Sequence, residues 1–190
     1  MKLNSELADY FDEFGKDIHV EAQRMLLRAG DVANGIYLVR TGAVRLCVCS
    51  AQGDEVSVQF FFEGDVVSSL ESLLSGSPSE MQLITMETCH LCAVDRAAVL
   101  ELVRSRPALQ AQLLALTQQR LIDYVKLYTS AITQTPEQRY LDMLATEGAH
   151  LTRIPLHILA GYLGITPVHL SRIRRKLKAQ ALAASLNICK

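Results

Sequence analysis

The sequence contains no apolar run that approaches the roughly 20 residues needed for a transmembrane helix. Its first residues, MKLNSELADYFDEF, are acidic and amphipathic, and they lack the basic and apolar regions of a signal peptide. These absences predict a cytoplasmic protein with no membrane partner. Apolar residues make up 49% of the chain, which excludes a disordered protein and allows a buried core.

The cysteines are irregularly placed along the chain. The five cysteines are an odd number without the spacing of a small disulfide scaffold, and none precedes Cys47. Cys89 and Cys92, in CHLC, have the spacing of a metal knuckle, but they would point to opposite faces of an extended strand. Because free cysteine is common in protein cores, we expect structural cysteines in a reducing compartment and no metal site. A metal- or redox-sensing role of Cys89 and Cys92 is the alternative.

The net charge of −1 conceals an uneven distribution. Residues 1–133 carry 11 Lys and Arg against 17 Asp and Glu, whereas residues 134–190 carry 8 against 3. Five of the basic side chains lie within residues 172–178. A basic C-terminal segment behind an acidic body is typical of a module that binds a polyanion, because phosphate contacts supply most of the nonspecific affinity for nucleic acid.

Residues 20–95 have the pattern of an antiparallel β-structure. Short apolar runs rich in β-branched and aromatic residues alternate with turns, and the turn glycines Gly30, Gly42, Gly53 and Gly64 are 11 or 12 residues apart. Gly53, in AQGDE, can adopt the positive φ of a hairpin turn. This regular spacing predicts a compact barrel or sandwich.

From Arg96 the apolar period becomes helical. A short helix should end before Pro107, which suits the first turn of a second helix without glycine or internal proline. That second helix carries two apolar stripes, so one face can pack on the β-domain and the other on a second copy of the chain. We predict a homodimer joined by a helix at residues 107–133, with these interface residues: Leu114, Thr117, Leu121, Tyr124 and Tyr128.

Residues 134–190 form a third region with a helical pattern. One helix should run from Pro136 to Gly148, a second should lie at about residues 155–163, and Pro167 should open the last. After Lys178 the sequence looks like a helical extension, with no evident wing hairpin.

The turn between the last two helices meets the requirements of a helix-turn-helix. Ala160 or Gly161 allows a close crossing, Gly164 allows a positive φ in the turn, and Thr166 can cap the helix that Pro167 opens. The polar face of that helix is then free to enter the major groove of DNA. We predict that the first residues of this face contact bases and that the later cations contact phosphates: Thr166, Val168, His169, Arg172, Arg175 and Lys176.

This order of elements resembles the cyclic-AMP receptor protein / fumarate-nitrate regulator (Crp/Fnr) family of transcription factors. Residues 24–73 are similar to its cyclic-nucleotide-binding-like β-roll, and residues 153–177 are similar to its helix-turn-helix signature. The resemblance implies an α+β fold with a β-roll sensor domain at residues 1–106, a dimerisation helix, and a helix-turn-helix (winged-helix-like) domain at residues 134–190.

The effector pocket that the resemblance implies departs from the members that bind cyclic AMP. In those members a Gly-Glu-Leu stretch binds the ribose through its Glu, and an Arg-Ser pair takes the cyclic phosphate. Glu71 is present here, but Ser79-Glu80 occupies the Arg-Ser position, and no arginine lies within residues 46–95. Tyr124 falls where the base is read. Because a carboxylate repels phosphate, the pocket of Glu71, Ser79 and Tyr124 is not suited to cyclic AMP.

The cofactor therefore stays unknown. The fumarate-nitrate type holds an iron–sulfur cluster on an N-terminal cysteine cluster, which is missing here before Cys47. Single histidines such as His19 and His90 leave haem ligation open, and the barrel could instead hold a small apolar effector or none.

These observations predict a homodimeric, non-enzymatic DNA-binding transcriptional regulator that recognises a two-fold-related site in double-stranded DNA. Arg172 matches the base-contacting Arg of the family, whereas Val168 replaces a Glu and could contact a thymine methyl group. The resemblance leaves RNA polymerase open as a further partner. A distant alternative is a cupin-type β-barrel binding protein or enzyme, which would need more metal-ligating histidines than the β-region contains.

Overall fold

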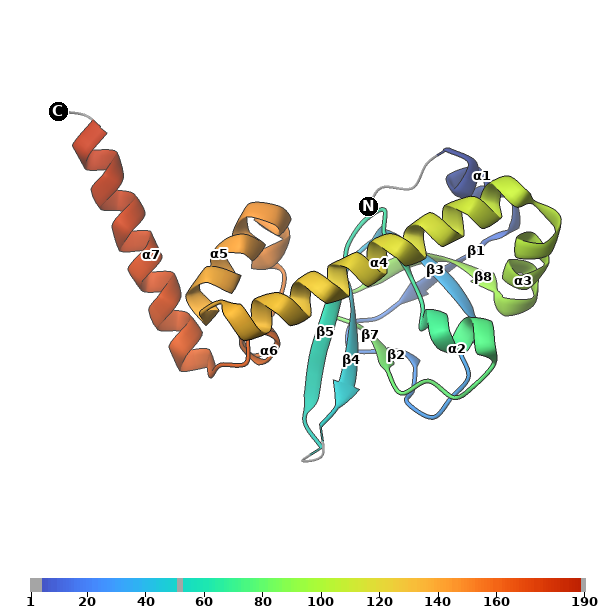
Figure 1. Cartoon of the computed structure of the whole chain (residues 1–190), viewed down its shortest axis with the longest axis horizontal. Helices are drawn as coiled ribbons and strands as arrows, with labels where there is room; N and C mark the ends of the chain where they lie inside the picture. The colour runs from blue at the N-terminus through green and yellow to red at the C-terminus, as the bar shows by residue number, and fades with distance from the viewer. Residues whose placement is uncertain (1–4, 51–52, 189–190) are drawn as a thin grey trace. The chain divides into compact units, whose positions relative to one another are not determined.

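One continuous helix, α4 (Pro107–Thr133), connects the two units into which the chain folds (Figure 1). The computed structural model describes residues 5–50 and 53–188. The units are Met1–Leu127 and Tyr128–Lys190, so the division by compactness falls inside α4. The domain boundaries predicted from the sequence instead mark the two ends of this helix.

Two four-stranded antiparallel sheets make up most of the first unit. Their strand orders are β1-β8-β3-β6 and β2-β7-β4-β5, and every strand pair is antiparallel. The predicted α+β fold with an N-terminal antiparallel roll is confirmed. The strands have these bounds: β1 Lys16–Val20, β2 Met25–Leu27, β3 Gly35–Thr41, β4 Val44–Cys49, β5 Glu55–Phe61, β6 Val66–Val67, β7 Gln82–Thr85 and β8 Cys89–Asp95.

A turn glycine at position 42 allows β3 and β4 to pass close to β8. Gly42 has a φ of 102°, in the left-handed region, and a Cβ there would lie 2.8 Å from the Cα of Cys89. Any larger residue would strain the backbone and collide with the neighbouring strand. The positive φ predicted for the hairpin glycine Gly53 is also present, at 87°.

Two helices of the first unit lie where the sequence predicts none. Helix α1 (Ser5–Phe14) buries Phe11 completely in the core of the roll. Helix α2 (Leu70–Ser75) interrupts the region of expected strands. The hydroxyl of Ser72 in α2 accepts a hydrogen bond from the backbone N–H of Ala33 at 2.9 Å. Long-range packing of this kind, rather than local pattern, fixes such short helices.

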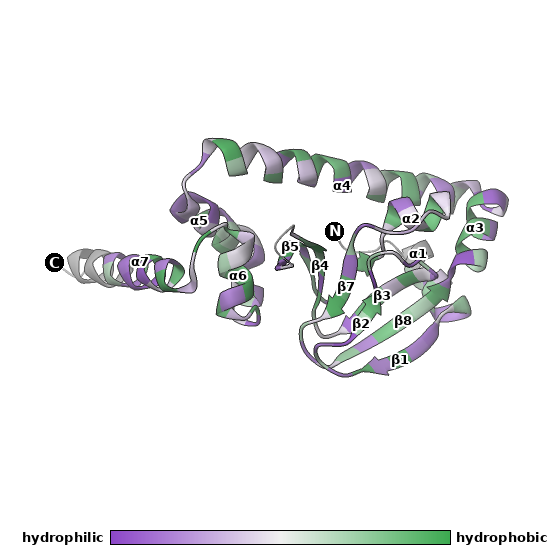
Figure 2. Cartoon of the chain, turned by 90° about the horizontal axis from the view of Figure 1, so that it is seen from below, coloured by the Kyte–Doolittle hydropathy of each residue, from purple (hydrophilic) through white to green (hydrophobic). Residues whose placement is uncertain are grey.

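Helices α3 (Arg96–Ser105) and α4 confirm the predicted change of period at Arg96. The Asp95 side chain caps α3 by accepting a hydrogen bond from the Ala98 N–H at 2.9 Å. Hydrophobic and hydrophilic segments alternate along α4 (Figure 2). Leu113 and Leu116 of α4 pack against the core of the roll, so one face of the helix closes the first unit.

The second unit is helical. Its elements are α5 (Pro136–Glu147), the 3₁₀ helix η1 (Gly148–Thr152), α6 (Leu156–Tyr162) and α7 (Pro167–Ile188). The starts at Pro136 and Pro167 agree with the prediction, and α7 continues as a helix through the predicted extension. The helices of the described residues include none with the length and hydropathy of a membrane span. The core residues of this unit are Tyr140, Leu151, Ile154, Ile158, Leu159, Ala160, Leu163, Leu170 and Ile173.

Candidate nucleic-acid interface and effector pocket

The turn between α6 and α7 is built on a left-handed glycine. Gly164 has a φ of 67°. Its N–H donates to the Gly161 carbonyl, and the Ile165 N–H donates to the Ala160 carbonyl, each at 3.0 Å. These two bonds are the Schellman arrangement that ends a helix. Ala160 is fully buried whereas Gly161 is exposed, so Ala160 is the small residue at the helix crossing.

The first turn of α7 is capped by Thr166. Its hydroxyl accepts a hydrogen bond from the His169 N–H at 3.2 Å, and Pro167 occupies the first helical position. The Thr166 hydroxyl is therefore already used in holding the helix start, although Thr166 itself is exposed.

One face of α7 is buried and the opposite face is open. Leu170 and Ile173 are 0% and 5% exposed, whereas Val168 is 62% exposed. His169, Arg172 and Arg175 are also exposed. Neither arginine forms a hydrogen bond or an ion pair with any of the described residues. The exposed face of α7 thus carries the apolar Val168 in its first turn, followed by Arg172 and Arg175, two cations without an ion-pair partner among the described residues.

Two other cations of α7 are engaged within the unit. The Lys176 Nζ lies 2.8 Å from a carboxylate oxygen of Glu137, at the start of α5. The Arg174 Nε donates to the Tyr140 hydroxyl at 3.1 Å, with its guanidinium 5.6 Å from the ring centroid. Sequence spacing could not reveal these partners, because they lie on a helix more than 30 residues away. Of the predicted phosphate contacts, Arg175 is thus open and Lys176 is paired.

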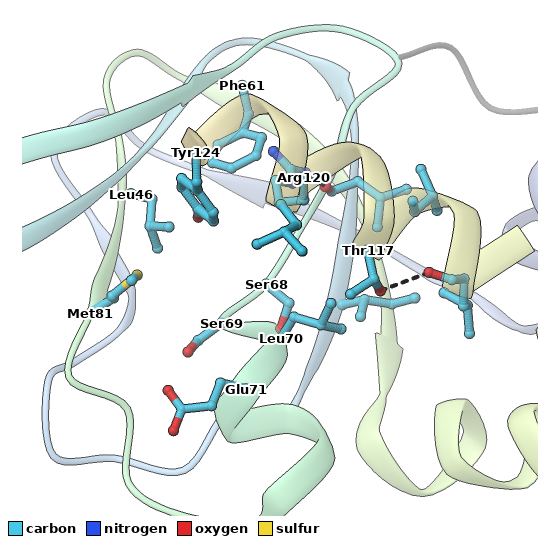
Figure 3. A pocket seen from close by; sticks show the side chains of 15 residues that line it. Leu46, Phe61, Ser68, Ser69, Leu70, Glu71, Met81, Thr117, Arg120 and Tyr124 are labelled. Carbon is cyan, nitrogen blue, oxygen red and sulfur yellow. Dashed lines mark hydrogen bonds between the residues drawn. The ribbon is translucent and has the colours of Figure 1, made fainter. Parts of the chain in front are cut away.

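A separate pocket lies within the first unit, between the roll and α4 (Figure 3). Its volume is about 280 Å³. Leu46 and Phe61 come from β4 and β5, and Met81 precedes β7. The remaining lining residues come mainly from α4 and from the segment around α2: Ile36, Val66, Ser68, Ser69, Leu70, Glu71, Leu113, Leu116, Thr117, Arg120, Leu121 and Tyr124.

The structure brings two of the three predicted pocket residues together. Glu71 and Tyr124 line the pocket, but Ser79 does not. Ser79 is buried behind the wall, where its hydroxyl donates to the Ser69 hydroxyl at 2.8 Å. Glu80, beside it, is exposed and is likewise not a lining residue.

Sequence reasoning missed Arg120, the cation of the pocket wall. Its Nη2 donates to the Val66 carbonyl at 3.0 Å, and its guanidinium lies 4.6 Å from the Phe61 ring centroid. Burial lowers the pKa of Arg120 and raises the pKa of the Tyr124 hydroxyl, four residues further along α4. Helical spacing from Thr117 and Tyr124 would have placed Arg120 on the same face.

The outward face of α4 differs in part from the predicted dimer interface. Thr117 and Tyr124 are turned into the pocket wall, because this side of α4 closes the roll. Leu114, Leu121 and Tyr128 are 57%, 64% and 71% exposed. They belong to a row of exposed residues at alternating three- and four-residue spacing, hereafter the α4 seam: Ala111, Leu114, Gln118, Leu121, Val125, Tyr128 and Ile132.

Comparison with known proteins adds to this geometry. The cyclic nucleotide-binding domain family matches residues 17–106. The chain is 23% identical to the transcriptional activator protein FnrA of Stutzerimonas stutzeri, covering 96% of this chain and 79% of that protein. It is 24% identical to the transcriptional activator protein Anr of Pseudomonas protegens, covering 97% of this chain and 80% of that protein. Over nearly its whole length the chain is thus similar to regulators of the Crp/Fnr type, and residues 17–106 match the cyclic nucleotide-binding domain.

Other relatives extend the Crp/Fnr comparison. An anaerobic regulatory protein of Haemophilus influenzae is 28% identical over 60% of this chain, which spans only 44% of that protein. Among solved structures, FixK2 from Bradyrhizobium japonicum superposes with a TM-score of 0.78 at 20% identity, covering 88% of this chain and 86% of FixK2. The c-di-GMP responsive regulator CLP of Xanthomonas campestris gives a TM-score of 0.71 at 19% identity, covering 94% of each chain. These likenesses show a shared fold.

None of the four described cysteines, Cys47, Cys49, Cys89 and Cys92, lines the pocket. Cys89 and Cys92 are buried and have different partners, since their thiols donate to the carbonyls of Ala43 at 3.5 Å and Phe11 at 3.2 Å. Cys189 is outside the described residues. The part of the chain that is described holds no group of three or more His, Cys, Asp or Glu side chains placed to bind a metal.

The two histidines considered for haem ligation face each other across paired strands. The rings of His19 on β1 and His90 on β8 stack with centroids 4.5 Å apart, and the His90 Nε2 lies 3.2 Å from a carboxylate oxygen of Asp17. Neither ring lines the pocket.

Proposed function

We propose that this chain is a DNA-binding transcriptional regulator that acts as a homodimer and places α7 in the major groove. The observation that carries the proposal is the open face of α7, where Arg172 and Arg175 have no partner among the described residues. The Gly164 turn and the Thr166 cap hold this helix against α6, with its buried side on the core of the unit. The regulators FnrA and Anr, which are relatives over nearly the whole chain, support the same role.

The chemistry of the exposed face suggests how DNA is read. Val168 lies on the first turn, where its methyl groups can contact a thymine methyl but cannot accept a hydrogen bond from cytosine. Arg172, one turn later, can donate two hydrogen bonds to guanine. Arg175 can contact the phosphate backbone, and His169 is exposed on the same helix.

The α4 seam supports the homodimer. An exposed, mostly apolar row with heptad spacing is the pattern of a helix that packs against a second copy of itself. Two copies joined along this seam would present two α7 helices. The DNA site is then two-fold related, with half-sites about 34–36 Å apart, one helical turn of B-DNA.

The test is fluorescence anisotropy of the purified chain on duplexes selected from genomic DNA, repeated across salt concentrations. We expect sequence-specific binding whose affinity falls steeply with salt, because phosphate contacts release counterions. The double variant Arg172→Ala/Arg175→Ala should lose this binding. The control is Arg104→Ala, an exposed arginine of α3 in the first unit. Selection that enriches no sequence, or equal binding by both variants, would contradict the proposal.

A further inference from the structure

The pocket of the first unit carries its cation on α4. Arg120 lies in the wall contributed by this helix, whereas the segment after α2, at Ser79-Glu80, contributes nothing to the lining. Glu71, the other charged lining residue, is exposed and lies at the far end of the pocket from Arg120 (Figure 3). A ligand with one negative charge is therefore attracted to the α4 wall and repelled from the Glu71 end.

Most hydroxyl groups of the wall are already occupied. The Ser68 hydroxyl donates to the Gly35 carbonyl, and the Thr117 hydroxyl donates to the Leu113 carbonyl, each at 2.8 Å. The Ser69 hydroxyl accepts a hydrogen bond from the buried Ser79. Besides Glu71 and the hydrogen that the Ser69 hydroxyl can still donate, few polar groups of this part of the wall are left for the hydroxyls of a sugar, which need partners of their own when they are buried.

Arg120 retains donors for a ligand. A guanidinium has five N–H donors in a planar fork, and one of those of Arg120 is used on the Val66 carbonyl. Burial lowers the pKa of Arg120 by more than Tyr124, Asp65 and Asp123 together raise it. The carboxylates of Asp65 and Asp123 thus do not offset the free-energy cost of burying this cation. An anion bound against the guanidinium would offset that cost.

The rest of the pocket is apolar. Leu46, Phe61, Met81, Leu113 and Leu116 face the same space, and its volume of about 280 Å³ lies just below the usual range for drug-sized ligands. A compact ring or a short branched chain matches these walls better than a nucleotide with its sugar and base.

We propose that this pocket binds a small organic carboxylate with an apolar body, the carboxylate against Arg120 and the Tyr124 hydroxyl. The apolar body packs between Phe61, Met81 and the leucines of α4. This inference rests on the proposed function, because it names the chemical class of effector that such a regulator would sense. It differs from cyclic AMP in needing no partner for a ribose or a purine.

Isothermal titration of the full chain with matched probes tests the inference. Phenylacetate is the carboxylate, and phenylacetamide is its neutral analogue of nearly the same shape. We expect phenylacetate to bind about tenfold or more tightly than the amide, because hydrogen bonds to a charged group are stronger than neutral ones. Arg120→Met should abolish this preference, because it should lower the affinity for phenylacetate and leave the affinity for phenylacetamide unchanged. Arg120→Lys should retain part of it, and the exposed control Arg104→Met should retain all of it.

Each outcome of the titration either supports or contradicts the proposed carboxylate site. Equal binding of the two probes by the unaltered chain overturns the inference without any variant, even where Arg120→Met fails to fold. So does the absence of binding by phenylacetate, 1-naphthylacetate and octanoate up to about 10 mM, beyond the weakest useful affinity. Anisotropy on DNA with the same preparation distinguishes the two proposals. Specific DNA binding without carboxylate selectivity removes the effector class alone, and selectivity without DNA binding removes the proposed function alone.

Discussion

Lys176 of α7 and Glu137 of α5 form an ion pair in which the lysine Nζ lies 2.8 Å from both carboxylate oxygens. The pair gives Lys176 a partner that Arg175, on the same helix, lacks among the described residues. Both members of the pair are partly solvated, so the pair is worth only about 0.2–1 kcal/mol. It therefore reduces the contribution of Lys176 to DNA binding without removing it.

We predict that Lys176→Ala weakens DNA binding less than Arg175→Ala. Glu137→Gln should strengthen nonspecific binding about two- to fivefold, because it frees Lys176 and removes a negative charge. The measurement is anisotropy across salt concentrations, where Arg175→Ala should lower the salt slope by about one unit. Equal losses for the two cations, together with no gain for Glu137→Gln, would show that the pair opens fully on DNA.

Arg172→Ala should change which sequences are bound. Removing a bidentate contact to guanine costs about 1–3 kcal/mol and relaxes the preference at one base pair of each half-site. Arg175→Ala, the matched phosphate-side control, should weaken binding almost uniformly across sequences. Selection from a random duplex pool with each variant makes the comparison. An unchanged preference at every position in the Arg172→Ala protein would refute its assignment to a base.

The features predicted correctly from the sequence are those set by local backbone chemistry. Pro107, Pro136 and Pro167 lack an N–H and have a fixed φ, so each marks a helix start that the structure confirms. Gly164 and Gly53 mark turns that need a positive φ. Such constraints involve few neighbouring residues. The helix starts and turns that they set can therefore be predicted from the sequence without knowing the fold.

The features that could not be predicted from the sequence depend on contacts between segments far apart in the chain. The partner of Lys176 lies 39 residues away, and Ser79 is removed from the pocket by a bond to Ser69 across the α2 segment. Thr117 and Tyr124 were expected at the outer face of α4, but the roll lies on their side of the helix. A helix with two apolar stripes does not by itself say which stripe is buried.

If the α4 seam is the dimer interface, one charged substitution within it should dissociate the dimer. Val125 is 57% exposed and does not line the pocket, so Val125→Glu should leave the first unit folded. Two carboxylates facing each other across a two-fold seam should raise the dimer dissociation constant by on the order of 100-fold. Sedimentation velocity over a concentration series measures this change. The control is Lys126→Glu, at the exposed neighbouring position outside the seam, and a monomeric unaltered chain would remove the seam as an interface.

The two cysteines of β4 should differ in reactivity. Burial raises the pKa of the Cys47 thiol to about 11, whereas Cys49 is exposed. Because the thiolate is the nucleophile, iodoacetamide at pH 8 should alkylate Cys49 well before Cys47. A raised pKa in the folded state means that Cys47 favours folding below the ordinary thiol pKa and loses this contribution as the pH rises toward 11. Mass mapping of a Cys189→Ser background follows both sites, and early labelling of Cys47 at pH 8 would contradict its burial.

The two glycines at the end of α6 provide a matched pair with opposite expectations. Neither has an atom within 4 Å of an added Cβ, so alanine meets no steric obstacle at either position. Gly164 has a φ of 67°, where an L-residue costs about 1–2 kcal/mol. Gly161 lies inside the helix, where alanine stabilises by about 0.5–1 kcal/mol.

Hydrogen–deuterium exchange of the α6 and α7 amides in the full chain reports on the stability of this unit directly, since the two units can unfold separately. Gly164→Ala should speed exchange about 5- to 30-fold, and Gly161→Ala should slow it. If both substitutions slowed exchange, the left-handed turn would not be what holds α7 in place.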